Sequence, residues 1–541
     1  MKISYDFQNY PLIKVFNNGK GRIIYDAKSD FAFFVSEAEF GFLKIILEND
    51  TIPDAFESNQ DFLKFRKAIE RIKSCGVFVK GPAKNIGPRD SEEIKKLVEY
   101  YKENIVIRKF NIEVTEDCTF RCKYCPNTLA ETGRTHTKKY ISEETANKAI
   151  DFYFDAYAKQ LRKLSKEKQK ELLTLNAPGI GWYGGEPLLN FDVIKKSHKY
   201  FLRKNWDEFD ADRSTFVFGL TTNLGYISLE MIDYFVENNV MLYVSIDGPE
   251  EEHNKNRVYK DGKGTFDSVY KNILKIKSLH PEYYGSKVFI ISVNTKNLDN
   301  LKCEEFFSKS NQSSNEIAGY KSRIVSDYSE RGKIIPDAKE KIINLNEVKE
   351  ESLQYFNEKL ESLSDKDFEA LEKDDFLPEF FQGLNSFLKI KYDKPYGCNN
   401  IHSIGTCPMG FDNLMVGADG NFHMCHKTDG SLPIGNVDTG LDYEKIAVSY
   451  LKFNETLSND NCKNCWAVRL CKACAAVKLN DGNFINASKD ECSFIRKSSE
   501  YLFNKFIMLQ NYENLMKFFE EKEKFNTDIG VIDINNFINK E

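Results

Sequence analysis

Three cysteines within eight residues constrain this chain more than any other feature. They stand in the segment Cys-Thr-Phe-Arg-Cys-Lys-Tyr-Cys, as Cys118, Cys122 and Cys125. A loop this short can wrap its thiolates around one centre, and a cubane 4Fe–4S cluster has four irons that each take one ligand. Three ligands from the loop leave the fourth iron free to bind a reactant. Zinc is the alternative, but it usually takes two pairs of ligands from separate loops, so we favour the cluster.

Length and composition set the broad class of protein. The chain has 541 residues, of which 41% are hydrophobic and 29% are charged, enough for several cores. A net charge of −6 gives no indication of nucleic-acid binding. We expect a cytoplasmic protein without a membrane partner, because no apolar run could span a bilayer and the N-terminus lacks a signal-peptide pattern. Thirteen cysteines in a reducing compartment indicate metal or cluster ligation instead of disulfides.

The segment 105–330 is predicted to alternate strand and helix. Such alternation indicates an α/β fold with a parallel sheet and crossover helices. The predicted strands are 110–116, 179–183, 215–220, 241–246, 289–294 and 319–326, with helices 142–157, 191–204, 228–238, 265–278 and 298–308 between them. Side chains that follow such strands gather at the carboxyl end of the sheet, which is where chemistry takes place in barrels of this kind.

Residues 1–80 are predicted to form a small separate domain. Short strands at 12–16, 22–25 and 31–35 are separated by turn residues, and Ser36 with Glu39 forms a capping box for a first helix. A second helix from about residue 61 and a closing strand at 77–79 complete this domain. Residues 81–104 are a linker, GPAKNIGPRD, and a connecting helix.

The C-terminal third divides into three predicted parts. Residues 331–397 are a charged helical bridge with an apolar stripe. The segment 398–495 holds eight of the thirteen cysteines, is rich in Gly, Asn and Asp, and is predicted to contain little regular structure. Because such a segment cannot build a large core, inorganic centres must hold it together. Residues 496–541 are predicted to be an amphipathic helix, 497–525, and a polar tail.

Polar motifs follow the predicted strands. Gly184 and Gly185 permit close approach of the backbone, and the carboxylate of Glu186 can accept hydrogen bonds from an ammonium group. Later in the chain an arginine, Arg257, can pair bidentately with a carboxylate. Each of these alone could be a turn or a surface ion pair, and the same holds for His253. The other candidates at strand ends are Thr222, Asn223, Ser245 and Asp247.

The cysteine loop, with Tyr124 before its last cysteine, resembles the signature of the radical S-adenosylmethionine (SAM) enzymes. The resemblance implies an open (β/α)6 barrel, an iron that chelates the amino and carboxylate groups of SAM, and an aromatic ring near the adenine. Gly184-Gly185-Glu186 resembles the family turn that holds the SAM amino group. By the same resemblance Ser245 and Arg257 lie near the SAM carboxylate, Asp247 accepts from a ribose hydroxyl, and Thr222 and Asn223 face SAM.

The C-terminal cysteines resemble the SPASM domain, which carries two auxiliary 4Fe–4S clusters. The resemblance implies Cys398, Cys407, Cys425 and Cys474 for auxiliary cluster I and Cys462, Cys465, Cys471 and Cys492 for auxiliary cluster II. The chain departs from the family in having two residues, not three, between Cys471 and Cys474. Without Cys398, cluster I would have an open iron. From this segment alone two zinc sites remain an alternative. Cys75 and Cys303 are interpreted as buried small hydrophobes.

The layout of residues 1–80 resembles the winged-helix peptide-recognition element of maturases that act on ribosomal peptides. The combined resemblance implies a maturase that uses a 5′-deoxyadenosyl radical to install a thioether or carbon–carbon crosslink. Its partners would be SAM, a precursor peptide with a leader, and an electron donor such as flavodoxin or ferredoxin. One alternative is an anaerobic sulfatase-maturing enzyme, which resembles residues 105–495 but usually lacks the first hundred. An alternative of another class is a non-catalytic iron–sulfur or zinc-stapled binding protein, in which the Gly-Gly-Glu turn would have no purpose.

Overall fold

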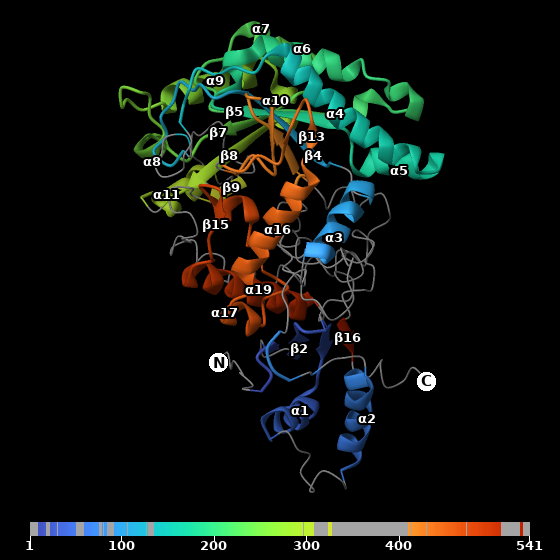
Figure 1. The fold of residues 1–541 in the computed structure, drawn as a ribbon. Helices are drawn as coiled ribbons and strands as arrows, with labels where there is room; N and C mark the ends of the chain where they lie inside the picture. The colour runs from blue at the N-terminus through green and yellow to red at the C-terminus, as the bar shows by residue number, and fades with distance from the viewer. Residues whose placement is uncertain are drawn as a thin grey trace, which may run out of the picture.

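The computed structural model of the chain is shown in Figure 1. It describes residues 9–17, 22–29, 31–49, 59–74, 78, 80–83, 91–104, 107–125, 127, 135–295, 297–307, 323–326, 409–411, 413–428, 430–471, 473–509 and 531–533. The predicted bridge 331–397 therefore lies outside the described residues, as do Cys75, Cys398 and Cys407. Within the described part of the chain, no helix combines the length and the apolar character needed to cross a membrane.

Six parallel strands form the centre of the molecule, and they are neighbours in chain order. They are β4 (Lys109–Thr115), β5 (Gly179–Gly184), β6 (Val217–Thr222), β7 (Met241–Ser245), β8 (Val288–Asn294) and β9 (Arg323–Ser326). The crossovers between them carry α4 (Glu143–Arg162), α5 (Lys166–Leu175), α6 (Phe191–Leu202), α7 (Leu229–Glu237), α8 (Glu250–Asn256), α9 (Phe266–Leu279), α10 (Pro281–Lys287) and α11 (Asn300–Phe307). The predicted α/β fold with a partial parallel barrel is confirmed.

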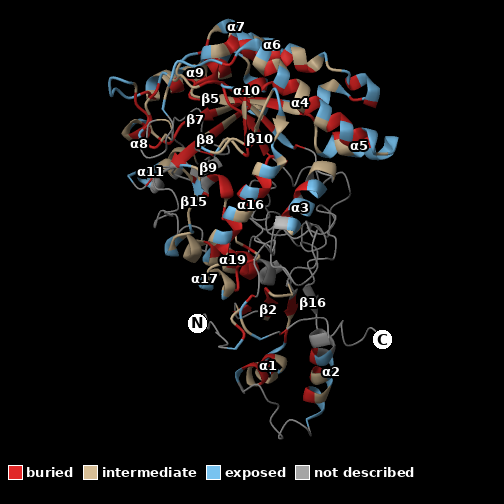
Figure 2. Cartoon of the chain, viewed as in Figure 1, coloured by how far each residue is buried: buried red, intermediate tan, exposed pale blue. Residues whose placement is uncertain are grey.

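Burial on both faces explains why these strands have nearly continuous apolar sequences. In β4, Phe110, Ile112 and Val114 are all buried. The long helix α4 begins after Ser142, whose side chain accepts a hydrogen bond from the backbone N–H of Thr145. Buried and exposed residues alternate along α4 and α6 (Figure 2), as expected of amphipathic helices that cover a sheet.

The C-terminal segment extends the same sheet instead of standing apart. Strand β10 (Asn413–Val416) pairs parallel with β4, and β11 (Asn421–His423), β12 (Gly435–Asn436) and β13 (Gly440–Leu441) continue antiparallel from it. The helix α16 (Tyr443–Leu457) then packs along α3 (Ser91–Asn104). The prediction of little regular structure in 398–495 is therefore wrong for this part. Ile446, Tyr450 and Phe453 are buried at helical spacing and supply the apolar face that the prediction overlooked.

The remaining C-terminal elements are short except for one. The helices α17 (Asp460–Lys463) and α18 (Ala475–Lys478) flank a loop, and β14 (Leu479–Asn480) pairs with β15 (Asn483–Phe484). The helix α19 (Lys489–Leu509) begins earlier than the predicted 497–525 and includes Cys492. Residues 510–525 lie outside the described residues.

The N-terminal part contains a three-stranded antiparallel meander and two helices, as predicted. The strands are β1 (Ile13–Asn17), β2 (Arg22–Asp26) and β3 (Phe31–Phe34), and the helices are α1 (Glu37–Asn49) and α2 (Gln60–Ser74). The capping box is present, because the backbone N–H of Ser36 donates to Glu39 and that of Glu39 donates to the Ser36 hydroxyl.

The fourth strand of this sheet was not predicted. It is β16 (Val531–Asp533), which pairs parallel with β3 and gives the order β1-β2-β3-β16. Of the predicted closing strand 77–79, only Phe78 is among the described residues, and it lies outside any strand with a φ of 60°. No local pattern could reveal β16, because its pairing partner lies at the other end of the sequence.

Candidate active site

The cysteine loop follows β4 and is fastened to a second loop of the barrel. The backbone N–H of Arg121 donates to the carbonyl of Val258 at 2.7 Å, and that of Lys123 donates to the carbonyl of Asn256 at 3.0 Å. Within the loop, the N–H of Cys125 donates to the carbonyl of Cys122 at 3.0 Å. These bonds give the loop a defined shape at the carboxyl end of the sheet.

Polar donors surround the sulfur atoms of this loop. The side-chain amide of Asn223 lies 3.5 Å from Sγ of Cys118, and the backbone N–H of Phe120 lies 3.4 Å from it. Nη1 of Arg257 lies 3.9 Å from Sγ of Cys122. Burial raises the pKa of both cysteine thiols to about 12, so the free thiols are protonated at neutral pH and a bound metal must displace their protons.

Three thiols, two of which have N–H donors close to sulfur, suit an iron–sulfur cluster, because hydrogen bonds to the sulfurs are one way in which proteins tune such clusters. Among the described residues, no three His, Cys, Asp or Glu side chains are arranged to hold a single metal ion.

The glycines of the Gly-Gly-Glu turn make room for the chain's own backbone. A Cβ on Gly184 would lie 2.2 Å from the carbonyl oxygen of Thr115, and one on Gly185 would lie 2.1 Å from that of Asp117. Gly184 also has a φ of +140°, which side-chain-bearing residues rarely adopt. The turn donates from Gly185 N–H to Thr115 and from Glu186 N–H to Asp117. Close packing of the ends of β4 and β5 therefore requires both glycines.

Glu186 is a buried carboxylate with three donors. Its Oε1 accepts from the hydroxyl of Thr222 at 2.7 Å and from the N–H of Leu188 at 3.1 Å, and its Oε2 accepts from the N–H of Asn223 at 2.7 Å. A carboxylate has about four acceptor positions, so one remains for a ligand. Burial raises the pKa of Glu186 to about 7, against the lowering effect of these hydrogen bonds.

Asp247 and Arg257 form a buried ion pair beside Tyr124. Nε of Arg257 lies 3.0 Å from Oδ2 of Asp247, within ion-pair distance although not aligned as a hydrogen-bond donor. The Tyr124 hydroxyl donates to the same oxygen at 2.7 Å, and the guanidinium lies 5.3 Å from the centre of the Tyr124 ring. Oδ1 of Asp247 accepts from the N–H of Val293 at 3.0 Å. The carboxylate of Asp247 thus orients both its neighbours.

His253 is hydrogen-bonded to the backbone of Asp247 and, through Thr265, to that of Arg257. Its Nδ1 accepts from the N–H of Asp247 at 3.3 Å, and its Nε2 lies 3.0 Å from the hydroxyl of Thr265, which donates to the carbonyl of Arg257. Burial lowers the pKa of His253 to about 3, so the ring is neutral. Ser245, the last residue of β7, is also buried at this end of the sheet.

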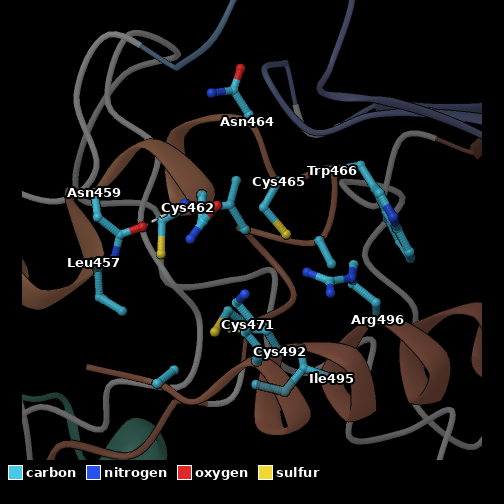
Figure 3. A pocket seen from close by; sticks show the side chains of 15 residues that line it. Leu457, Asn459, Cys462, Asn464, Cys465, Trp466, Cys471, Cys492, Ile495 and Arg496 are labelled. Atoms are coloured by element: carbon cyan, nitrogen blue, oxygen red, sulfur yellow. Dashed lines mark hydrogen bonds between the residues drawn. The ribbon is translucent and has the colours of Figure 1, made fainter. Parts of the chain in front are cut away.

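Four of the predicted auxiliary-cluster cysteines line one cavity (Figure 3). Cys462, Cys465, Cys471 and Cys492 come from α17, the loop after it and α19, and they surround a volume of about 380 Å³. Arg496 also lines this cavity. A donor set of four thiols around one cavity fits a 4Fe–4S cluster, which takes one thiolate at each iron.

The other predicted cluster is only partly described, because Cys398 and Cys407 lie outside the described residues. Cys425 follows β11, and Cys474 directly precedes α18. Sγ of Cys425 lies 3.6 Å from Nδ1 of His426, and the His426 ring lies 5.2 Å from that of Tyr183 in β5. Cys425 therefore lies close to the barrel. Sequence reasoning missed His426, and its position next to a predicted ligand was the available signal.

Cys75 and Cys303 are the two cysteines that were not assigned to a cluster. Cys75 is outside the described residues. Cys303, on α11, is half-buried instead of fully buried. Its sulfur lies 2.7 Å from the place that a Cβ on Gly248 would take, so Cys303 packs against the loop after β7.

The segment that carries the cysteine loop and the strand-end residues is similar in sequence to known proteins. Residues 112–302 match the family model described as the Radical SAM superfamily. Radical SAM cyclopropyl synthase TigE of Paramaledivibacter caminithermalis is 28% identical over 177 residues, which are 32% of this chain and 33% of that protein. The serine-type anaerobic sulfatase-maturating enzyme of Bacteroides thetaiotaomicron is 30% identical over 173 residues, 32% of this chain and 36% of the other. The matched region thus spans about a third of these relatives.

A solved structure, native anSMEcpe with bound AdoMet, has the same fold. It superposes with a TM-score of 0.50 at 19% identity and covers 74% of this chain and 99% of its own. The matched core, residues 112–302, is thus of the radical SAM type.

Proposed function

We propose that this enzyme is a maturase that installs a thioether or carbon–carbon crosslink in a ribosomally made peptide. The supporting observation is that one chain combines a radical SAM core, a four-thiol cavity and an N-terminal sheet with two helices that packs beside that cavity. Two of the curated relatives are a cyclopropyl synthase and a sulfatase-maturating enzyme. Because these relatives carry out different reactions, the peptide substrate and the crosslinking reaction of this chain are proposals.

In this proposal the barrel residues bind and orient SAM. Cys118, Cys122 and Cys125 would hold the cluster that supplies the electron for cleavage of SAM to methionine and a 5′-deoxyadenosyl radical. Glu186 would accept from the SAM amino group with its remaining lone pair. Arg257 would pair with the SAM carboxylate.

The other predicted contacts with SAM fall into two groups. Asp247 already has three protein partners, so we assign it the orientation of Tyr124 and Arg257 ahead of a ribose contact. Thr222 and Asn223 act through Glu186, which they hold.

The electron balance of a crosslink requires an acceptor. One substrate hydrogen leaves as an atom to the 5′-deoxyadenosyl radical, and a second leaves as a proton together with one electron. We propose that two auxiliary centres take this electron. The first would be held by Cys462, Cys465, Cys471 and Cys492, and the second by Cys398, Cys407, Cys425 and Cys474. A flavodoxin or ferredoxin would supply the first electron. The peptide is thus oxidised by two electrons while SAM is reductively cleaved.

The leader of the precursor peptide would add to the N-terminal sheet as an extra strand, a common mode of peptide recognition. The three-stranded meander has two edges, β1 and β3, and β16 pairs with the β3 edge. This pairing is short, with three residues in register. Each net backbone hydrogen bond contributes only about 0.5–1.5 kcal/mol, while ordering each residue costs about 1–2 kcal/mol. A longer leader strand could therefore replace β16.

The experiment is anaerobic incubation of the reconstituted enzyme with SAM, a reductant and the small peptide encoded beside its gene, followed by mass spectrometry. We expect a product that is lighter by two hydrogen atoms and whose fragmentation locates a crosslink. The proposal fails if the neighbouring peptide is unchanged while SAM is cleaved.

An anaerobic sulfatase-maturating activity is the second candidate, favoured by the 30% identity with the serine-type enzyme. Such an enzyme would oxidise a Ser or Cys to formylglycine, whose aldehyde reacts with a hydrazide reagent. A sulfatase-derived peptide that gains a hydrazide-reactive group, beside a neighbouring peptide that does not change, would establish this candidate.

A further inference from the structure

The N-terminal sheet is covered on both faces. Residues on one face, such as Val15, Ile24 and Phe33, pack with residues of α1 and α2. The opposite face belongs to the same core as the cluster-loop segment and α19. The sheet is therefore held by a specific surface and not only by the linker 81–90.

Aromatic contacts form one part of the apolar side of this second interface. The ring of Phe16 in β1 stacks on Phe503 of α19 at 4.2 Å and meets the edge of Trp466 at 5.4 Å. Tyr25 in β2 lies 5.1 Å from the same Phe503 ring. Trp466 directly follows Cys465 in the sequence and lines the four-thiol cavity, so one side chain contacts both the cavity and the sheet.

The polar part of the interface depends on Arg469. Its Nε donates to the carbonyl of Ala27 at 2.6 Å, and its Nη2 donates to the carbonyl of Lys28 at 3.0 Å. These carbonyls belong to the turn between β2 and β3. A backbone bond from Ala83 N–H to the carbonyl of Lys463 at 2.8 Å adds a further contact. A planar guanidinium can hold two successive carbonyls, which an ammonium cannot do with the same geometry.

The residues that make these contacts alternate in the sequence with the cysteines of the four-thiol cavity. Lys463 and Trp466 directly follow Cys462 and Cys465, and Arg469 lies between Cys465 and Cys471. The ten residues from Cys462 to Cys471 thus supply three thiols to the cavity, two side chains that contact the sheet or its turn, and one carbonyl that accepts from Ala83. Any change in the backbone of this loop must affect both sides.

We propose that Arg469 is a positioning residue that couples the four-thiol cavity to the N-terminal sheet. Closing the four thiols around a common centre holds the loop in the shape that presents Arg469 and Trp466 to the sheet. Because such coupling is reciprocal, a docked sheet also makes the centre harder to remove. The inference rests on the proposed function in one respect, the identity of that centre as a 4Fe–4S cluster.

The first test is hydrogen exchange of the full-length, reconstituted chain carrying Arg469→Ala. We expect exchange in residues 22–29 to rise about tenfold, because a charge-assisted contact to two carbonyls is lost and the turn opens more often. Arg469→Lys should restore part of the protection. Arg162→Ala is the control, because it removes a guanidinium with two hydrogen bonds to Glu208 outside this interface, and it should leave exchange in 22–29 unchanged. Equal exchange in Arg469→Ala and the native chain would overturn the inference.

The second test measures how the contact between Arg469 and the sheet affects the retention of iron at the four thiols. Chelator should remove iron from the Arg469→Ala protein several-fold faster than from the native protein, in the fraction assigned to the auxiliary centres, while SAM binding stays unchanged. Cys471→Ala should raise exchange in 22–29 as Arg469→Ala does. Unchanged iron release together with unchanged exchange in Cys471→Ala would overturn the coupling. A native chain that holds iron only at Cys118, Cys122 and Cys125 would instead refute the proposed auxiliary centre, and the Arg469→Ala exchange would still decide the positioning role.

Discussion

Glu186 is buried, accepts three hydrogen bonds and still has one acceptor position left. Its raised pKa of about 7, against an ordinary value of 4.5, results from burial. A carboxyl group with a raised pKa stabilises the fold below its unfolded value, and this contribution is lost as the pH rises through about 7. We therefore predict that the melting temperature of Glu186→Gln, relative to the native chain, increases between pH 5 and pH 8 in cluster-free protein.

Scanning calorimetry across this pH range measures the difference. Glu230→Gln is the control, because Glu230 is an exposed partner of Lys195 and its loss should not change the pH dependence. A difference in melting temperature between Glu186→Gln and the native chain that does not change with pH would contradict the prediction.

In the reconstituted protein, Glu186→Ala should also weaken SAM binding about ten- to a hundredfold.

Arg257 is predicted to matter for folding as well as for ligand binding. Removing it leaves the fully buried carboxylate of Asp247 without its cation, and breaking a buried pair costs about 3–5 kcal/mol. We expect Arg257→Ala to lower the free energy of unfolding by about that amount in urea titrations. The double variant Asp247→Asn/Arg257→Ala should be more stable than Arg257→Ala alone. If both variants unfold at the same urea concentration, the buried charge is not the cause.

At the scale of elements, the loop after β4 is expected to act as a separate ligand unit. Replacing Cys118, Cys122 and Cys125 together with Ala should remove one 4Fe–4S cluster and all SAM cleavage, because the four thiols of the cavity belong to α17, the loop after it and α19. Iron analysis and detection of 5′-deoxyadenosine check the two effects. SAM cleavage by this triple variant would place the site elsewhere.

Local patterns predicted the elements of the barrel well and their contacts poorly. Hydrophobic runs bounded by turn residues revealed all six parallel strands, since buried strands and amphipathic helices each leave a periodic signal. Glu186, Thr222 and Asn223 were each named as candidates, but their mutual hydrogen bonds depend on the order of β5 and β6 in space. Arg469 could not be found at all, because an arginine in a polar loop has the same sequence pattern whether it meets solvent or a carbonyl.

For the whole molecule, the pairing of β16 with β3 gives a test of peptide docking. We predict that a chain truncated after residue 525 binds a labelled synthetic peptide of residues 526–541, whereas the full chain, whose own strand occupies the β3 edge, binds it much more weakly. An intramolecular strand has an effective concentration in the millimolar range, so the difference should be large. Fluorescence anisotropy measures both affinities, and a peptide of scrambled sequence is the control. Equal binding by the two proteins would contradict the prediction.

The same pairing has a consequence for the order of synthesis. β3 ends at Phe34 and β16 begins at Val531, so about 500 residues are translated between them, which takes roughly 25–100 s at ordinary rates. During that time the β3 edge of the nascent sheet is without its fourth strand, and an open edge pairs readily with other extended chains. In a newly made chain the β3 edge is therefore open to other extended segments until β16 is made and completes the sheet.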